Sequence, residues 1–190
     1  MFLFDPTQDP RFRIWMEGSK PNYTRIEMVG RQDTFLIETI NRICRLTGLA
    51  QTQRTKRPLI VVVTKYDTWG HKAPTDFVMD PWREKNGKTG LEIGVIEKRS
   101  EELRKLLRQL TPEVVGAADS ISEKVTYIPV SALGQTPARD ANTNKAMIRP
   151  LDIRPIGVVT PMLYGLFQSS VSLIQVLRSK SERKAAGGVK

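Results

Sequence analysis

The chain has 190 residues, 39% of them hydrophobic and 26% charged, which is typical of one globular domain with its own core. Its net charge of +10 favours an acidic partner, such as nucleic acid, an acidic membrane or an acidic protein, without choosing among them. No apolar run is long enough to span a bilayer, and the single cysteine excludes an intramolecular disulfide. These features predict a cytoplasmic protein without a transmembrane segment.

The first part of the chain predicts an edge strand, a long connection and a helix. Met1–Phe4 is an apolar run that stops at an aspartate, as at the carboxyl end of a buried strand whose beginning is missing. Residues 7–30 mix proline, glycine and charge, which favours an irregular connection. From Asp33 the apolar residues follow the helical period up to Gly48. Cys44 falls on this apolar stripe, so we interpret it as a core residue rather than a nucleophile.

The middle of the chain predicts a central strand followed by a loop and two helices. Residues 59–63, LIVVV, form a continuous β-branched run, which is typical of a parallel strand buried on both faces by helices. Residues 68–90 are expected to form a loop. Apolar spacing then predicts a helix over 92–110, and Thr111-Pro112 indicates the start of a shorter helix that reaches Ala118.

The last part of the chain predicts a third strand and a final helix. Residues 125–130 form another apolar strand, and residues 158–177 have helical spacing. The alternation of strands and helices predicts an α/β fold, a three-layer sandwich with a parallel sheet. We assign residues 1–178 to this domain and 179–190 to a basic flexible tail. Because the tail lacks interleaved aromatic residues, the sequence does not favour nucleic-acid binding.

Polar residues follow the predicted strands, where open parallel sheets bind their ligands. The Asp67 carboxylate can accept the two adjacent donors of guanine, which adenine lacks. The aliphatic stem of Lys65 can cover the face of the base while its ammonium stays in water, and Thr64 can tie the loop to neighbouring backbone. On the next strand, Ser131 can hold Asp67 in place, and the backbone N–H of Ala132 can donate to an exocyclic oxygen.

The segments that carry these residues resemble motifs of P-loop GTPases. PLIVVVTKYD is similar to the strand and [N/T]KxD motif of that family, and VTYIPVSAL is similar to its later strand and SA[K/L] motif. MFLFDPTQDPRFR resembles the strand that precedes them. The resemblance implies the C-terminal half of a GTPase-like domain, with Thr64, Lys65, Asp67, Ser131 and Ala132 around guanine. Thr64 stands where asparagine is commoner in the family, and Leu133 where lysine is common.

The sequence contains no counterpart of the family's phosphate-binding half. The pattern GxxxxGK[S/T] is absent, and residues 5–8 are not DxxG. The resemblance therefore implies a domain truncated at its N-terminus, to which no hydrolytic residue can be assigned. It also implies GTP or GDP as ligand, with Mg²⁺ only if the missing half is supplied. His71, the sole histidine, has no cysteine or second histidine for a metal site and is interpreted as a solvated loop residue.

Two kinds of partner are compatible with this interpretation. The first is the missing N-terminal half of the domain, supplied upstream in the gene or by another chain. The second is a different protein. The alternative function is accordingly a non-enzymatic protein-interaction fragment of a degenerate GTPase-like protein, in which the exposed edge at Met1–Phe4 and the apolar face of the sheet dock that partner.

Overall fold

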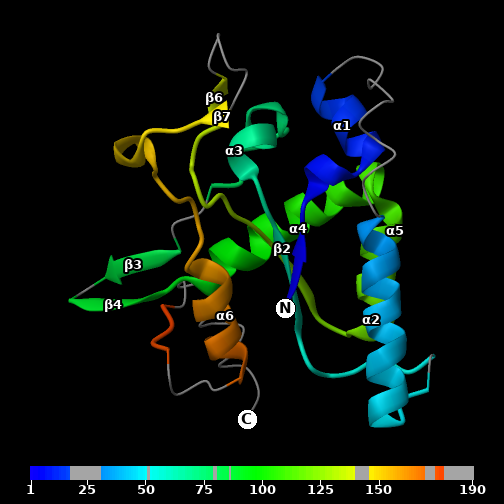
Figure 1. Cartoon of the computed structure of the whole chain (residues 1–190). Helices are drawn as coiled ribbons and strands as arrows, with labels where there is room; N and C mark the ends of the chain where they lie inside the picture. The colour runs from blue at the N-terminus through cyan, green and yellow to red at the C-terminus, as the bar shows by residue number, and fades with distance from the viewer. Residues whose placement is uncertain are drawn as a thin grey trace.

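A parallel sheet forms the centre of the molecule (Figure 1). The computed structural model describes residues 1–17, 31–50, 52–78, 81–85, 87–139, 146–169 and 174–177. Its central sheet contains β1 (Phe2–Phe4), β2 (Leu59–Val63) and β5 (Val125–Pro129), in the order β1-β2-β5. Both pairs are parallel, and the register places Leu3 opposite Val62, which in turn lies opposite Ile128. The predicted α/β class, the parallel sheet and the central position of residues 59–63 are confirmed.

Helices and short hairpins surround this sheet. The α-helices are α1 (Pro10–Glu17), α2 (Gln32–Thr47), α3 (Tyr66–Trp69), α4 (Ile93–Leu110), α5 (Pro112–Ile121) and α6 (Thr160–Ser169). Two antiparallel hairpins pair β3 (Trp82–Lys85) with β4 (Lys88–Leu91), and β6 (Ala138–Arg139) with β7 (Ala146–Met147). Single 3-10 turns lie at Pro6–Gln8, Gly70–Lys72 and Pro150–Asp152.

The alternating side chains of β2 separate two hydrophobic clusters. Val61 and Val63 belong to a cluster that contains side chains of α1, α2, α5 and the second half of α4. Ile60 and Val62 belong to a second cluster, which contains Tyr164 of α6 and side chains of β4 and the first half of α4. Because successive residues of a strand point to opposite faces, each cluster covers one side of the sheet. Figure 1 shows α6 on one side and α2 with α5 on the other, compatible with a three-layer sandwich.

The predicted helices before and after β2 are largely confirmed. Helix α2 ends at Gly48, which adopts the left-handed conformation with φ of 68°. Helix α4 matches the predicted range within one residue. Helix α5 starts at Pro112 as predicted but continues to Ile121, three residues beyond Ala118. Cys44 is buried, as expected for a core residue.

The predicted irregular connection over residues 7–30 is wrong in its first part. Pro10–Glu17 form helix α1, and residues 18–30 lie outside the described part of the chain. The Asp9 carboxylate accepts the N–H of Arg11 at 2.9 Å and that of Phe12 at 3.4 Å, so Asp9 caps the helix. Pro10 supplies a preset φ at the first helical position, and the Asp-Pro pair was the signal for this helix in the sequence.

Two further predictions need correction. The segment 68–90 contains the β3–β4 hairpin, whose turn has Gly87 at φ of 68°. The final helix ends at Ser169 and does not reach residue 177. Residues 174–177 are extended beside β4, where the Leu91 N–H donates to the Gln175 carbonyl at 2.8 Å and the Leu177 N–H donates to the Leu91 carbonyl at 3.0 Å. The edge of β4 that does not pair with β3 offers these hydrogen bonds, and they favour an extended conformation of residues 174–177 over the helix that their apolar spacing predicts.

The predicted tail, residues 179–190, lies outside the described residues. Within the described ranges, every helix is too short or too polar to cross a membrane.

Candidate functional site

The loop that follows β2 is tied to both neighbouring strands. The Thr64 N–H and hydroxyl both donate to the Phe4 carbonyl, at 2.8 and 3.2 Å, which is the backbone contact predicted for Thr64. On the other side, the Tyr66 N–H donates to the Val130 carbonyl at 3.0 Å. Lys65 lies between them with φ of 56°, the single non-glycine residue with positive φ in the described part of the chain. This left-handed turn costs about 1 kcal/mol, and the contacts on both sides hold it.

Trp69 supports the loop from within the core. Its side chain is fully buried, and its indole N–H donates to the Thr64 carbonyl at 2.9 Å. The ring lies edge-on to Phe12, with centroids 5.6 Å apart, and edge-on to Tyr66, with centroids 4.9 Å apart. No sequence pattern indicates this role of Trp69, because its partner is a backbone carbonyl five residues earlier.

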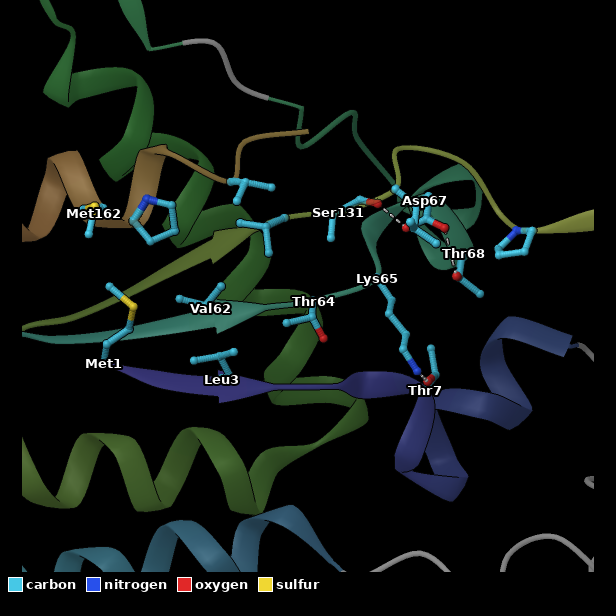
Figure 2. Close-up of a pocket in the computed structure, with 16 residues that line it drawn as sticks. Met1, Leu3, Thr7, Val62, Thr64, Lys65, Asp67, Thr68, Ser131 and Met162 are labelled. Atoms are coloured by element: carbon cyan, nitrogen blue, oxygen red, sulfur yellow. Dashed lines mark hydrogen bonds between the residues drawn. The ribbon is translucent and has the colours of Figure 1, made fainter. Parts of the chain in front are cut away.

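Asp67 and Ser131 meet where β2 and β5 end (Figure 2). The Ser131 hydroxyl donates to Asp67 Oδ1, as the sequence predicted, and accepts the Gly134 N–H at 2.7 Å. Asp67 Oδ2 accepts the Thr68 hydroxyl at 3.4 Å. Ser131 is buried, whereas Asp67 is partly exposed. Each oxygen of an ionised carboxylate can accept more than one hydrogen bond, so both oxygens keep capacity for a ligand.

The loop that carries Ala132 is held by the segment around residue 156. Ser131 and Ile156 exchange two backbone hydrogen bonds of 2.9 and 2.8 Å, and the Arg154 N–H donates to the Leu133 carbonyl at 2.9 Å. Gly134 has φ of 76°, and a Cβ atom at this position would lie 1.7 Å from the Arg154 carbonyl oxygen. Only glycine therefore fits this turn. Ala132 is exposed at the rim of the site.

Lys65 reaches from the end of β2 to the end of β1. Its ammonium nitrogen lies 2.7 Å from Asp5 Oδ2 and donates to the Thr7 hydroxyl at 3.4 Å. The side chain is half exposed, and Figure 2 shows its stem stretched toward Thr7. Asp5 and Thr7 were not among the predicted site residues, although their position directly after an apolar strand was the available signal. The ion pair fixes the course of the Lys65 stem.

Side chains at the carboxyl ends of β1, β2 and β5 line one cavity of about 840 Å³, within the size range of small-molecule sites. All five predicted site residues belong to it. Its polar end contains Thr7, Thr64, Lys65, Asp67, Thr68, Ser131 and Ala132. Its other end, the apolar arm, contains Met1, Leu3, Val62, Val130, Val158, Pro161 and Met162. Figure 2 shows the two ends on opposite sides of Thr64. The cavity therefore suits a ligand whose hydrogen-bond donors face Asp67.

Comparisons with known proteins and the search for metal sites add no assignment. No family model matches the chain, and no similar curated protein or solved structure was found. Within the described residues, no group of three or more His, Cys, Asp or Glu is placed to hold a metal ion, and His71 is exposed. A functional interpretation must come from the cavity itself and from the motifs that line it.

Proposed function

We propose that this chain is a guanine-nucleotide-recognition module, the C-terminal half of a P-loop GTPase-like domain without a phosphate-binding loop. The observation that carries the proposal is the Asp67 carboxylate, which Ser131 holds at the polar end of a cavity of about 840 Å³. The two motif-bearing strands are adjacent and parallel, so their carboxyl ends meet at one edge of the sheet. That arrangement supports the resemblance of TKYD and SAL to guanine-binding motifs.

Each proposed contact follows from the chemistry of its side chain. Asp67 accepts the N1–H and the 2-amino group of guanine, whereas adenine offers neither donor in that arrangement. The Lys65 stem, fixed by Asp5, lies under one face of the base. The Ala132 N–H donates to the exocyclic oxygen. Thr64 and Ser131 act through the backbone and through Asp67, so they position the site rather than touch the base.

The proposal includes limits on chemistry and location. GTP and GDP are candidate ligands, and Mg²⁺ is required only if another half-domain supplies its ligands. We expect the isolated chain to hydrolyse no GTP above buffer background, because the residues that stabilise developing phosphate charge are not in its sequence. Cys44 is a free, buried thiol, which suits a reducing compartment such as the cytoplasm.

Isothermal titration calorimetry with guanosine and adenosine compounds tests this function. We expect the wild-type chain to bind guanosine and GDP more tightly than adenosine and ADP. Asp67→Asn should remove most of that preference, about tenfold or more, because an amide cannot accept both guanine donors. Glu123→Gln is a matched control, since it removes one exposed carboxylate at the opposite end of β5. Equal affinity for guanosine and adenosine in the wild-type chain would contradict the proposal.

A second candidate function is the protein-interaction fragment. The observation that favours it is the exposure of Met1 and Leu3, at 64% and 65%, in the apolar arm beside the outer edge of β1. Large apolar side chains next to an unpaired strand edge are common features of docking surfaces. The two functions can be tested separately. Leu3→Glu should abolish docking at the apolar arm and should leave the preference for guanosine over adenosine, which Asp67 sets, unchanged.

A further inference from the structure

We infer that this cavity selects guanine compounds without phosphate groups, the free base or the nucleoside, over GDP and GTP. The inference rests on the proposed function, since it names the ligand class of the same site. Three properties of the cavity support it: its hydroxyl groups already donate hydrogen bonds within the protein, its polar end carries little positive charge, and its other end is apolar.

The hydroxyl groups of the lining already donate their protons within the protein. Four hydroxyls line the cavity, those of Thr7, Thr64, Thr68 and Ser131. Their acceptors are Asp5 Oδ1 for Thr7 at 2.6 Å, the Phe4 carbonyl for Thr64, and the Asp67 carboxylate for Thr68 and Ser131. A phosphate group is an acceptor and needs donors, whereas guanine presents donors. The side-chain hydrogen bonding of the site thus favours the base and offers little to a phosphate.

The charge balance of the polar end points the same way. Lys65 is the single basic side chain among the described residues that line the cavity, and its ammonium already lies 2.7 Å from the Asp5 carboxylate. The Asp5 carboxylate thus neutralises the Lys65 ammonium, and the Asp67 carboxylate leaves the side chains of the polar end with a net negative charge. A diphosphate that enters this end meets net negative charge at short range. The net charge of +10 does not offset this, because charges beyond about 8 Å are largely screened at physiological ionic strength.

The apolar arm removes the remaining route for a phosphate chain. Beyond Thr64 the lining consists of side chains such as Leu3, Val62, Val130 and Met162. A charged phosphate loses its hydration against these side chains, and none of them offers it a hydrogen-bond donor. The ribose of a nucleoside loses far less, since it carries no charge.

Calorimetry of the full chain with guanosine, GMP, GDP and GTP, with and without Mg²⁺, tests the inference. We expect affinity to fall as phosphates are added, with GDP at least about tenfold weaker than guanosine. If GDP or GTP binds as tightly as guanosine, this inference is overturned while the guanine site stands. If guanosine binds no better than adenosine, or no guanine compound binds, the proposed function fails and this inference falls with it.

Asp5→Asn sharpens the test, because it frees the Lys65 ammonium to meet a phosphate. We expect the ratio of GMP affinity to guanosine affinity to rise several-fold in this variant. The ratio is measured on one preparation, so a general loss of folded protein cancels. Glu123→Gln, at the opposite end of the sheet, should leave the ratio unchanged. An unchanged ratio in Asp5→Asn contradicts the role assigned to the Asp5–Lys65 pair and overturns the charge argument.

Discussion

Leu3 and Phe4 are neighbours in β1, yet Phe4 is 1% exposed and Leu3 is 65% exposed. Phe4 points to the side that also carries Val61 and Val63, the closed face, where α1, α2, α4 and α5 complete the core. Leu3 points to the side that carries Val62 and Val130. Side chains of α4, α6 and β4 cover part of this side, and the uncovered part beside β1, the open face, holds the apolar arm of the cavity. The closed face therefore contributes mainly to stability, and the open face is available for binding.

Truncation of a leucine on each face gives the largest expected difference. Leu107→Ala on the closed face removes a fully buried side chain, and we expect it to lower the free energy of unfolding by about 2–5 kcal/mol. Leu3→Ala on the open face should cost under about 1 kcal/mol, because most of that side chain is already in water. Urea unfolding with both variants measures the two values. Equal losses would show that the faces do not differ in this way.

Removal of the Ser131 hydroxyl should affect binding on the open face. Ser131→Ala leaves Asp67 Oδ1 without its buried donor and the Gly134 N–H without its acceptor. We expect the preference for guanosine over adenosine to fall by about tenfold, in line with the loss of one hydrogen bond to a charged group. Ser120→Ala, which removes a hydroxyl bonded to the Ala117 carbonyl of α5, is the matched control for calorimetry. Full preference in Ser131→Ala would mean that Asp67 needs no support.

The strands and helices differ in how well the sequence predicted them. The buried run 59–63 and the helices 32–47 and 93–110 were predictable, because one apolar pattern repeats over each whole element. The hairpin 82–91 was missed, since WREK and KTGL have no regular apolar alternation. Its second strand is instead stabilised by residues 174–177, a long-range contact that local pattern does not contain.

The site was predictable only in part for a similar reason. Asp67 and Ser131 follow two strands, and adjacent parallel strands bring their carboxyl ends together, so the Asp67–Ser131 contact could be expected. The Lys65–Asp5 pair depends on the left-handed turn at Lys65 and on β1 lying beside β2. Neither feature produces a periodic pattern in the sequence, and from the motif alone we expected the Lys65 ammonium to stay in water.

Alkaline pH should weaken the closed face through Tyr66. Burial raises the pKa of the Tyr66 hydroxyl from 10.0 to about 12, and this hydroxyl donates to Asp76 at 2.9 Å and accepts the Phe77 N–H at 3.0 Å. Because the folded pKa lies above the unfolded one, the stabilisation is complete below pH 10 and is lost as pH rises through 12. Tyr66→Phe should therefore lose less stability across this range than the wild type, as measured by urea midpoints.

Tyr127 provides the internal reference for that measurement. Burial raises its pKa as well, and it is present in both proteins, so the difference between the two pH profiles isolates Tyr66. Parallel profiles would mean that the Tyr66 hydroxyl does not titrate from the buried state.

Self-association through the outer edge of β1 should be the smallest of these effects. Within the described residues β1 pairs only with β2, so its other edge is open to a strand of a second molecule. However, the side-chain amide of Gln32 occupies this edge at Asp5: it accepts the Asp5 N–H at 2.9 Å and donates to the Asp5 carbonyl at 2.8 Å. The open edge is therefore short, and we expect weak, concentration-dependent association rather than a stable dimer.

Sedimentation analysis over a range of concentrations measures this association. Leu3→Glu places a charge in the apolar arm beside the open edge and should reduce association several-fold, since a buried unpaired carboxylate is costly. Gln32→Ala should increase it, because the backbone groups of Asp5 become available to a second strand. Leu46→Glu is the matched control, since Leu46 is 87% exposed on α2, away from β1. If Leu46→Glu reduces association and Leu3→Glu does not, the contact lies on α2, and the open face of the sheet is then a binding cavity without a docking role.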